Sequence, residues 1–195
     1  MSRRWSSASP RCAAVLVLLS IVSGCARDPT QLVAVNLIDR LSAADRRPSE
    51  QAFDVVGHQA DGRELAAIRA VVPSRLTIPM VMPRRAVFRA EVALAGTAPV
   101  PVRFRVGVSD HRIYESLAEV TIQPEAGAAW TSVSADLSAY AGRKWSVFYQ
   151  PDGRTWRLVL AADAAAGQPG VAIWGRPRIE ASPDDVKQYL TRATR

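Results

Sequence analysis

The chain has 195 residues, of which 48% are hydrophobic and 22% charged, so it can bury a core and does not have the composition of a disordered polymer. This length suits one compact domain rather than two. With two histidines and two cysteines, the chain has few side chains that could ligate a metal cluster. The net charge is +7, but the basic residues are scattered along the chain, so we expect no nucleic-acid binding.

The N-terminal segment has the layout of an export signal. Three arginines lie in residues 1–11, and the apolar run over residues 12–22 is too short to span a bilayer as a helix. Residues 22–25 read Val-Ser-Gly-Cys, which resembles the lipobox of bacterial lipoproteins. The resemblance implies a signal peptide over residues 1–24 and acylation of Cys25, palmitate included. The alternative is an ordinary secretory peptide with a coincidental cysteine.

Cleavage at this position has two consequences for the mature protein. It removes Cys12, so Cys25 is the one remaining cysteine and no disulfide is expected. The resemblance also implies that the mature protein is exported to the cell envelope and attached to a membrane through the lipid on Cys25, at the outer membrane or the periplasmic face.

The first part of the mature chain, residues 25–48, is expected to be a tether and a short helix. Leu32, Val35 and Ile38 recur at three-residue steps, which predicts one amphipathic helix ending near Pro48. Signals over residues 49–69 are weak. Residues 51–56 have the composition of a strand, and Asp61-Gly62 that of a turn.

From Ser74 onward the hydrophobic period changes to two, which is typical of half-buried antiparallel strands. Residues 156–162 and 171–174 are apolar at consecutive positions, as expected for central strands covered on both faces. Turn residues separate the segments, so we predict an all-β, antiparallel two-sheet sandwich over residues 49–181 and a polar tail over 182–195. The predicted strands are 76–82, 86–94, 100–108, 117–122, 130–137, 144–149, 155–162 and 170–179.

Two segments resemble galactose-binding-like jelly-roll domains. They are residues 130–143, Trp-Thr-Ser-Val-Ser-Ala-Asp-Leu-Ser-Ala-Tyr-Ala-Gly-Arg, and residues 172–179, Ala-Ile-Trp-Gly-Arg-Pro-Arg-Ile. The resemblance implies a jelly-roll sandwich of the kind used as carbohydrate-binding modules and as modules ahead of catalytic domains. The motif residues also have structural explanations: Asp136 accepts backbone N–H bonds at a turn, and Pro177 interrupts strand pairing at an edge or bulge.

The sequence offers little for catalysis. His58 falls in the weak-signal region, and His111 beside Asp110 has the chemistry of a general base. No nucleophile elbow, zinc-protease motif or glycine-rich phosphate loop accompanies either histidine. We therefore predict no enzyme activity, no cofactor and no metal site, with a hydrolase using His111 as a weak alternative. Calcium at Asp136 or Asp152 is not expected, because no spaced set of carboxylates appears.

The loop after the strand 100–108 carries the best binding chemistry. Aromatic faces cover the C–H patches of sugars, while carboxylate, guanidinium and imidazole groups bind adjacent hydroxyls. The competing interpretation is an exposed polar loop with its tyrosine packed on the sandwich. Trp145, Trp156 and Trp174 follow core positions. The predicted ligand-binding residues are Asp110, His111, Arg112, Tyr114 and, at a strand start, Trp130.

These observations predict a membrane-anchored, non-catalytic lipoprotein that binds carbohydrate or cell-wall glycan. The alternative is an envelope assembly lipoprotein that docks another protein through an arginine-rich strand face. Arg89, Arg103 and Arg105 point outward with Glu91 in this pattern, either as a self-paired solvated face or as a site for an acidic glycan.

Overall fold

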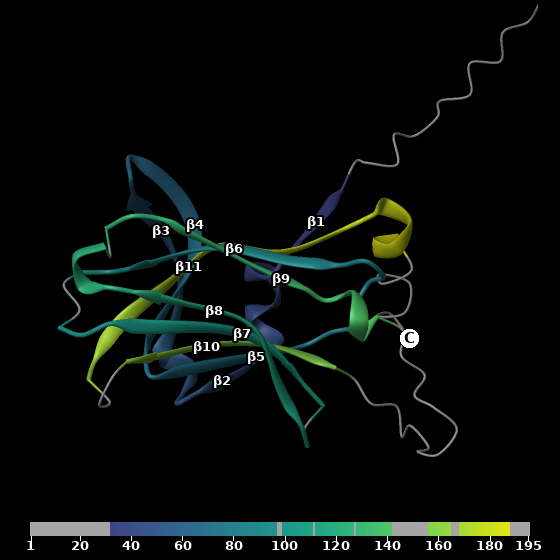
Figure 1. Cartoon of the computed structure of the whole chain (residues 1–195), viewed down its shortest axis with the longest axis horizontal. Coiled ribbons are helices and arrows are strands. Elements are labelled where there is room, and N and C mark those ends of the chain that lie inside the picture. Colours follow the sequence, from purple (N-terminus) through teal and green to yellow (C-terminus); the bar gives the residue numbers. More distant parts are fainter. Residues whose placement is uncertain are drawn as a thin grey trace, which may run out of the picture.

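The protein is a sandwich of two antiparallel β-sheets, seen edge-on in Figure 1. This computed structural model describes residues 32–96, 99–110, 112–126, 128–141, 156–164 and 168–187. Every strand pair in these ranges is antiparallel. The predicted two-sheet architecture is confirmed.

The larger sheet has six strands in the order β3-β4-β11-β6-β9, and β1 pairs with the C-terminal half of β11. Its strands are β1 (Val33–Asn36), β3 (Phe53–Ala60), β4 (Arg63–Val72), β6 (Val87–Leu94), β9 (Thr131–Asp136) and β11 (Gly170–Ala181).

The smaller sheet has five strands in the order β2-β5-β10-β7-β8. Its strands are β2 (Asp45–Arg47), β5 (Ser74–Pro79), β7 (Val102–Ser109), β8 (Tyr114–Ile122) and β10 (Arg157–Ala164). β10 and β11, the two strands that are apolar at consecutive positions, each lie between two partners, as the sequence predicts.

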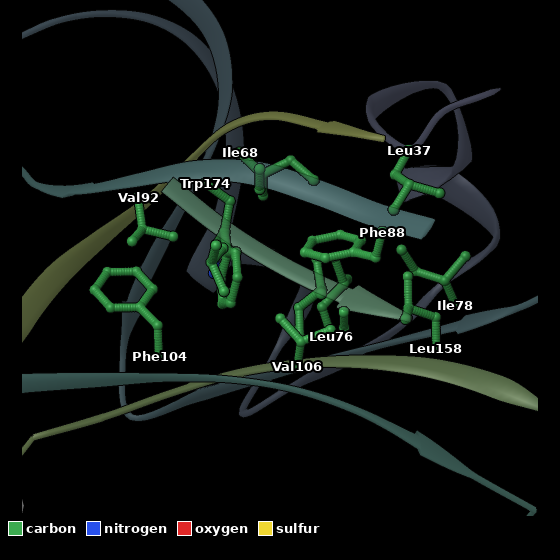
Figure 2. Packing of buried hydrophobic residues seen from close by; sticks show 14 of the residues in the cluster. Leu37, Ile68, Leu76, Ile78, Phe88, Val92, Phe104, Val106, Leu158 and Trp174 are labelled. Atoms are coloured by element: carbon green, nitrogen blue, oxygen red, sulfur yellow. The ribbon is translucent and has the colours of Figure 1, made fainter. Parts of the chain in front are cut away.

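The core fills the space between the inner faces of the two sheets (Figure 2). The rings of Phe104 and Trp174 meet edge to face at 5.1 Å between centroids, joining β7 of one sheet to β11 of the other. Phe88 and Ile68 from the larger sheet and Leu158 from the smaller one are fully buried around them. Alternation along each strand therefore leaves the opposite set of side chains on the outer faces.

The prediction of an amphipathic helix within residues 25–48 is wrong. The segment forms strand β1, the 3₁₀-helix Ile38–Ala43 and strand β2. β1 pairs with β11, and the Leu37 N–H donates to the Pro177 carbonyl at 2.9 Å. Pairing with a strand distant in sequence outweighs the weak helical spacing here. β1 and β2 thus belong to the two sheets and do not form a separate leading segment.

The weak-signal region forms a hairpin of β3 and β4. Its turn lies at Asp61-Gly62, as predicted, and both residues have positive φ values of 51° and 69°. Two such residues in succession suit the two-residue turns that match the twist of paired strands. β4 was missed because its alanines have little β propensity and its apolar residues do not alternate.

The end of β5 differs from its prediction, whereas Pro177 and Asp136 have the predicted roles. β5 ends at Pro79, earlier than the predicted strand 76–82, although Met80 and Met82 remain buried. Pro177 lies in a β-bulge of β11 between Gly175 and Arg178, and Asp136 accepts from the Ser138 N–H at 2.8 Å, both as predicted.

The C-terminal region is described only in part, and the strand predicted over 144–149 lies wholly outside the described residues. Residues 183–187 are helical, whereas residues 188–195 and 142–155 lie outside the described residues. Cys25 and residues 1–24 also lie outside them. Within the described ranges, no helix has the length and apolar character needed to cross a membrane.

Candidate functional site: a basic groove on the five-stranded sheet

The outer face of the five-stranded sheet carries a groove of about 460 Å³, a size within the usual range for small-ligand sites. All five strands contribute to it. Its lining residues are Arg47, Pro48, Pro73, Ser74, Arg75, Arg105, Tyr114, Val159, Ala161 and Asp163.

Two small apolar residues of β10 line the groove. Val159 and Ala161 occupy the positions that alternate with the core residues Leu158 and Leu160, so their side chains point outward. β10 lies between β5 and β7, and its short side chains leave room for long ones from both neighbours. The consecutive apolar residues of this central strand thus serve the core on one face and the groove on the other.

Tyr114 reaches the groove because Gly107 has no side chain. A Cβ atom at Gly107 would lie 2.7 Å from Cε2 of Tyr114, closer than real Cβ contacts. The pairing of β7 with β8 shifts register between Val106 and Gly107, next to this contact. Such a bulge changes where the following side chains point. The glycine and the bulge together place the ring over β7, with 36% of Tyr114 exposed.

Arg75 lies over this ring from the other side of the groove. Its Cζ atom is 5.4 Å from the ring centroid, within the range of a cation–π contact. Arg75 is directly opposite Arg47 in the pairing of β5 with β2, which places two guanidinium-bearing residues side by side. No carboxylate of the described residues forms an ion pair with Arg75.

The other two guanidinium groups of the groove have carboxylate partners. Arg105 donates to Asp163, and Arg47 lies 3.4 Å from a carboxylate oxygen of Asp45. Burial disfavours the charged form of Arg105, but the hydrogen bond and the charge of Asp163 outweigh it and raise the pKa of Arg105. Arg105 therefore stays charged, as arginine does in proteins generally.

The predicted loop site is only partly brought to this groove. Asp110 is 6% exposed and accepts hydrogen bonds from the backbone N–H groups of Arg112 and Ile113 at 3.0 and 2.9 Å. This carboxylate holds the loop that leads into β8. Arg112 is exposed, and His111 lies outside the described residues. Of the predicted binding residues that the structure describes, Tyr114 alone lines the groove.

Trp130 belongs to the opposite sheet. It is 9% exposed and caps a small apolar cluster on the outer face of the six-stranded sheet, with Leu65 and Ile173 beneath it. Its indole N–H donates to the Arg63 carbonyl at 3.2 Å, and its ring meets His58 edge to face at 5.5 Å. Burial lowers the pKa of His58. Trp130 thus covers apolar surface and lies apart from the groove.

The outward arginines are divided between the two sheets. Arg103 and Arg105 are on β7, whereas Arg89 is on β6 and donates to Glu180 at 2.8 Å. Glu91, Arg176 and Arg178 extend that network across the six-stranded sheet. The sequence prediction therefore describes two surfaces: a self-paired one on the larger sheet and a grooved one on the smaller sheet.

Sequence reasoning missed Arg47, Arg75 and Asp163. Each lies at an outward position of a strand, but the sequence does not reveal that β2, β5 and β10 are neighbours. Among the described residues, no group of three or more metal-ligating side chains gathers at one place.

Comparison with known proteins bears on the fold. No family model and no curated protein matches the chain. A chain of Clostridium perfringens ZmpB, comprising the M60 catalytic domain with the CBM51-1 and CBM51-2 domains, superposes with a TM-score of 0.51 at 13% identity over 77% of this chain and 15% of that one. This chain spans 28% or less of that and two further ZmpB chains.

Two isolated carbohydrate-binding modules superpose less closely. They are the C-terminal CBM6 of LamC from Zobellia galactanivorans (TM-score 0.42, 16% identity, 78% of this chain and 99% of that one) and CBM6-3 from Clostridium stercorarium in complex with cellobiose (0.42, 14%, 75% and 90%). The fold is an antiparallel two-sheet jelly-roll sandwich.

Proposed function

We propose that the protein is a membrane-anchored, non-catalytic lipoprotein that binds a carbohydrate chain in the groove of the five-stranded sheet. The groove is the observation that carries this proposal. It combines an aromatic ring, guanidinium donors and a carboxylate acceptor around an apolar patch, which is the mixture that saccharides require. The jelly-roll fold is compatible with this role, and the Val-Ser-Gly-Cys motif supports the anchor.

The groove is better suited to a saccharide than the predicted loop is. Tyr114 on β8 and Asp163 on the central strand β10 both line it, so an aromatic side chain and a carboxylate acceptor for hydroxyl groups are available to one ligand. In the loop, by contrast, the Asp110 carboxylate already accepts two backbone hydrogen bonds. The self-paired arginines of the six-stranded sheet offer no comparable support for docking a protein.

Binding is tested with the full-length protein in detergent micelles, by affinity electrophoresis through gels that contain neutral or acidic polysaccharides. We expect at least one polysaccharide to retard the protein, and the double variant Arg75→Ala with Tyr114→Ala to abolish the retardation. Arg63→Gln, an exposed arginine on β4 of the other sheet, is the control and should retain it. The recovered polysaccharide should keep its chain length, because no catalysis is proposed.

Absence of retardation in every gel, or equal retardation of the double variant, would contradict the proposal. The anchor is tested separately by mass spectrometry of the mature N-terminus. We expect an acylated Cys25 and release of the Cys25→Ser variant from the membrane fraction. An unmodified N-terminus would refute the anchor and leave the groove untouched.

A further inference from the structure

Among the described residues, Arg75 is the cation of the groove that pairs with no carboxylate. Arg105 has Asp163 and Arg47 has Asp45, whereas no described carboxylate forms an ion pair with Arg75. The described residues of the lining include three guanidinium groups and one carboxylate, Asp163, so together they carry an excess of positive charge. An excess of one sign in a concave surface concentrates ligands of the opposite sign.

Tyr114 also points to a charged ligand. Its ring contacts β7 at Gly107, and the Arg75 guanidinium lies 5.4 Å above its centroid. A neutral sugar that stacked on this ring would have to displace the guanidinium. The ring already holds the guanidinium in place, and this preorganisation lowers the entropic cost of binding an anion.

The positions of the carboxylates restrict where a negative group can bind. Asp163 on β10 forms an ion pair with Arg105, and its negative charge would repel an anion that bound beside Arg105. On the other side of the groove, Arg75 and Arg47 face each other on the paired strands β5 and β2. The carboxylate that pairs with Arg47 belongs to Asp45, whose side chain is 46% exposed. The guanidinium fork of Arg75 is therefore the best position for an oxyanion, while Asp163 can accept hydrogen bonds from sugar hydroxyls.

We infer that the groove selects an acidic saccharide, whose carboxylate or sulfate group binds the Arg75 guanidinium beside Tyr114. This inference rests on the proposed carbohydrate binding and adds the charge class of the ligand. Carboxylate and sulfate share the required chemistry, namely a planar or trigonal face of oxygen acceptors that pairs with a guanidinium.

Matched polysaccharides test the inference. The full-length protein is titrated in micelles with polygalacturonate and its methyl ester, and with dextran sulfate and dextran. We expect at least one acidic member to bind about tenfold tighter than its neutral counterpart, the effect of one charge-assisted pair. A preference confined to polygalacturonate identifies a carboxylate ligand, and one confined to dextran sulfate identifies a sulfate ligand.

Variants separate a built site from general attraction. Arg75→Gln should lose about tenfold in affinity for the acidic ligand, and Arg75→Lys should lose several-fold because it keeps the charge but not the fork. Arg63→Gln makes the same charge change on the other sheet and should bind as the unaltered protein does. Thermal unfolding of each variant confirms that it is folded.

Three results overturn the inference. Equal losses in Arg75→Gln and Arg63→Gln would mean diffuse electrostatic attraction. Equal affinity for acidic and neutral members, with no effect of Arg75→Gln, would refute the acidic ligand but leave carbohydrate binding intact. Binding to none of the four polysaccharides, together with no retardation in any gel, would refute both proposals.

Discussion

The two outer faces of the sandwich carry the same residue types, but these residues pair with one another on one face and line a groove on the other. On the six-stranded sheet, Arg89, Arg176 and Arg178 pair with Glu91 and Glu180, and Trp130 seals the neighbouring apolar cluster. On the five-stranded sheet, an aromatic ring and the arginine that lies over it line a groove. Composition does not distinguish these faces.

The difference lies in what each residue contacts. Trp130 donates its indole N–H to a backbone carbonyl and is nearly buried, whereas Tyr114 is one-third exposed and contacts Arg75. A satisfied residue stabilises the fold and has little left to offer a ligand. The six-stranded face should therefore respond to mutation through stability, and the five-stranded face through binding.

The largest expected effect is on Trp130. Replacing this nearly buried indole with alanine should lower the free energy of unfolding by about 3 kcal/mol, because a cavity replaces its contacts with Leu65 and Ile173. Urea unfolding followed by circular dichroism measures the loss. Saccharide binding by the folded fraction should be unchanged, so a selective loss of binding would break the distinction between the faces.

Two glycines provide a matched pair. A Cβ at Gly107 would collide with the Glu115 carbonyl oxygen and with the Tyr114 ring at 2.7 Å, and one at Gly175 would collide with the Trp130 ring at 2.7 Å. Gly107→Ala and Gly175→Ala should each lower the unfolding free energy by about 1–3 kcal/mol, the usual cost of overpacking. Titration with acidic polysaccharide should find weaker binding in Gly107→Ala alone. Weaker binding in Gly175→Ala would indicate that the groove is not the site.

A smaller effect is expected at Arg89. Its ion pair with Glu180 is partly exposed, so Arg89→Gln should change the unfolding free energy by less than about 1 kcal/mol. Equilibrium unfolding checks this value, and affinity electrophoresis should show unchanged retardation. Reduced retardation would place the ligand on the six-stranded sheet.

The smallest effect is at Asp136, at the end of β9. Hydrogen bonds from the Ser138 side chain and backbone lower the pKa of Asp136 below its ordinary value of 3.8. The ionised carboxylate thus stabilises the fold above that value, and the contribution disappears as pH falls through the lowered pKa. Asp136→Asn should be slightly less stable at neutral pH and equal in acid. A difference that persisted in acid would contradict this cause.

Much of the fold could be predicted from alternation and turn residues, as β6, β7 and the Asp61-Gly62 turn illustrate. The helix expected before residue 48 failed because the pairing of β1 with β11 joins residues far apart in the sequence. The groove could not be predicted from the sequence for the same reason. Arg75, Tyr114 and Asp163 come from three strands whose adjacency is a property of the topology.

The most direct test of the account follows the arginine side-chain Nε–Hε resonances of the full-length protein by nuclear magnetic resonance during titration with acidic polysaccharide. The account predicts that the resonances of Arg75 and Arg47 shift, while those of Arg89 and Arg176 on the opposite sheet stay in place. Shifts confined to the six-stranded sheet would contradict it.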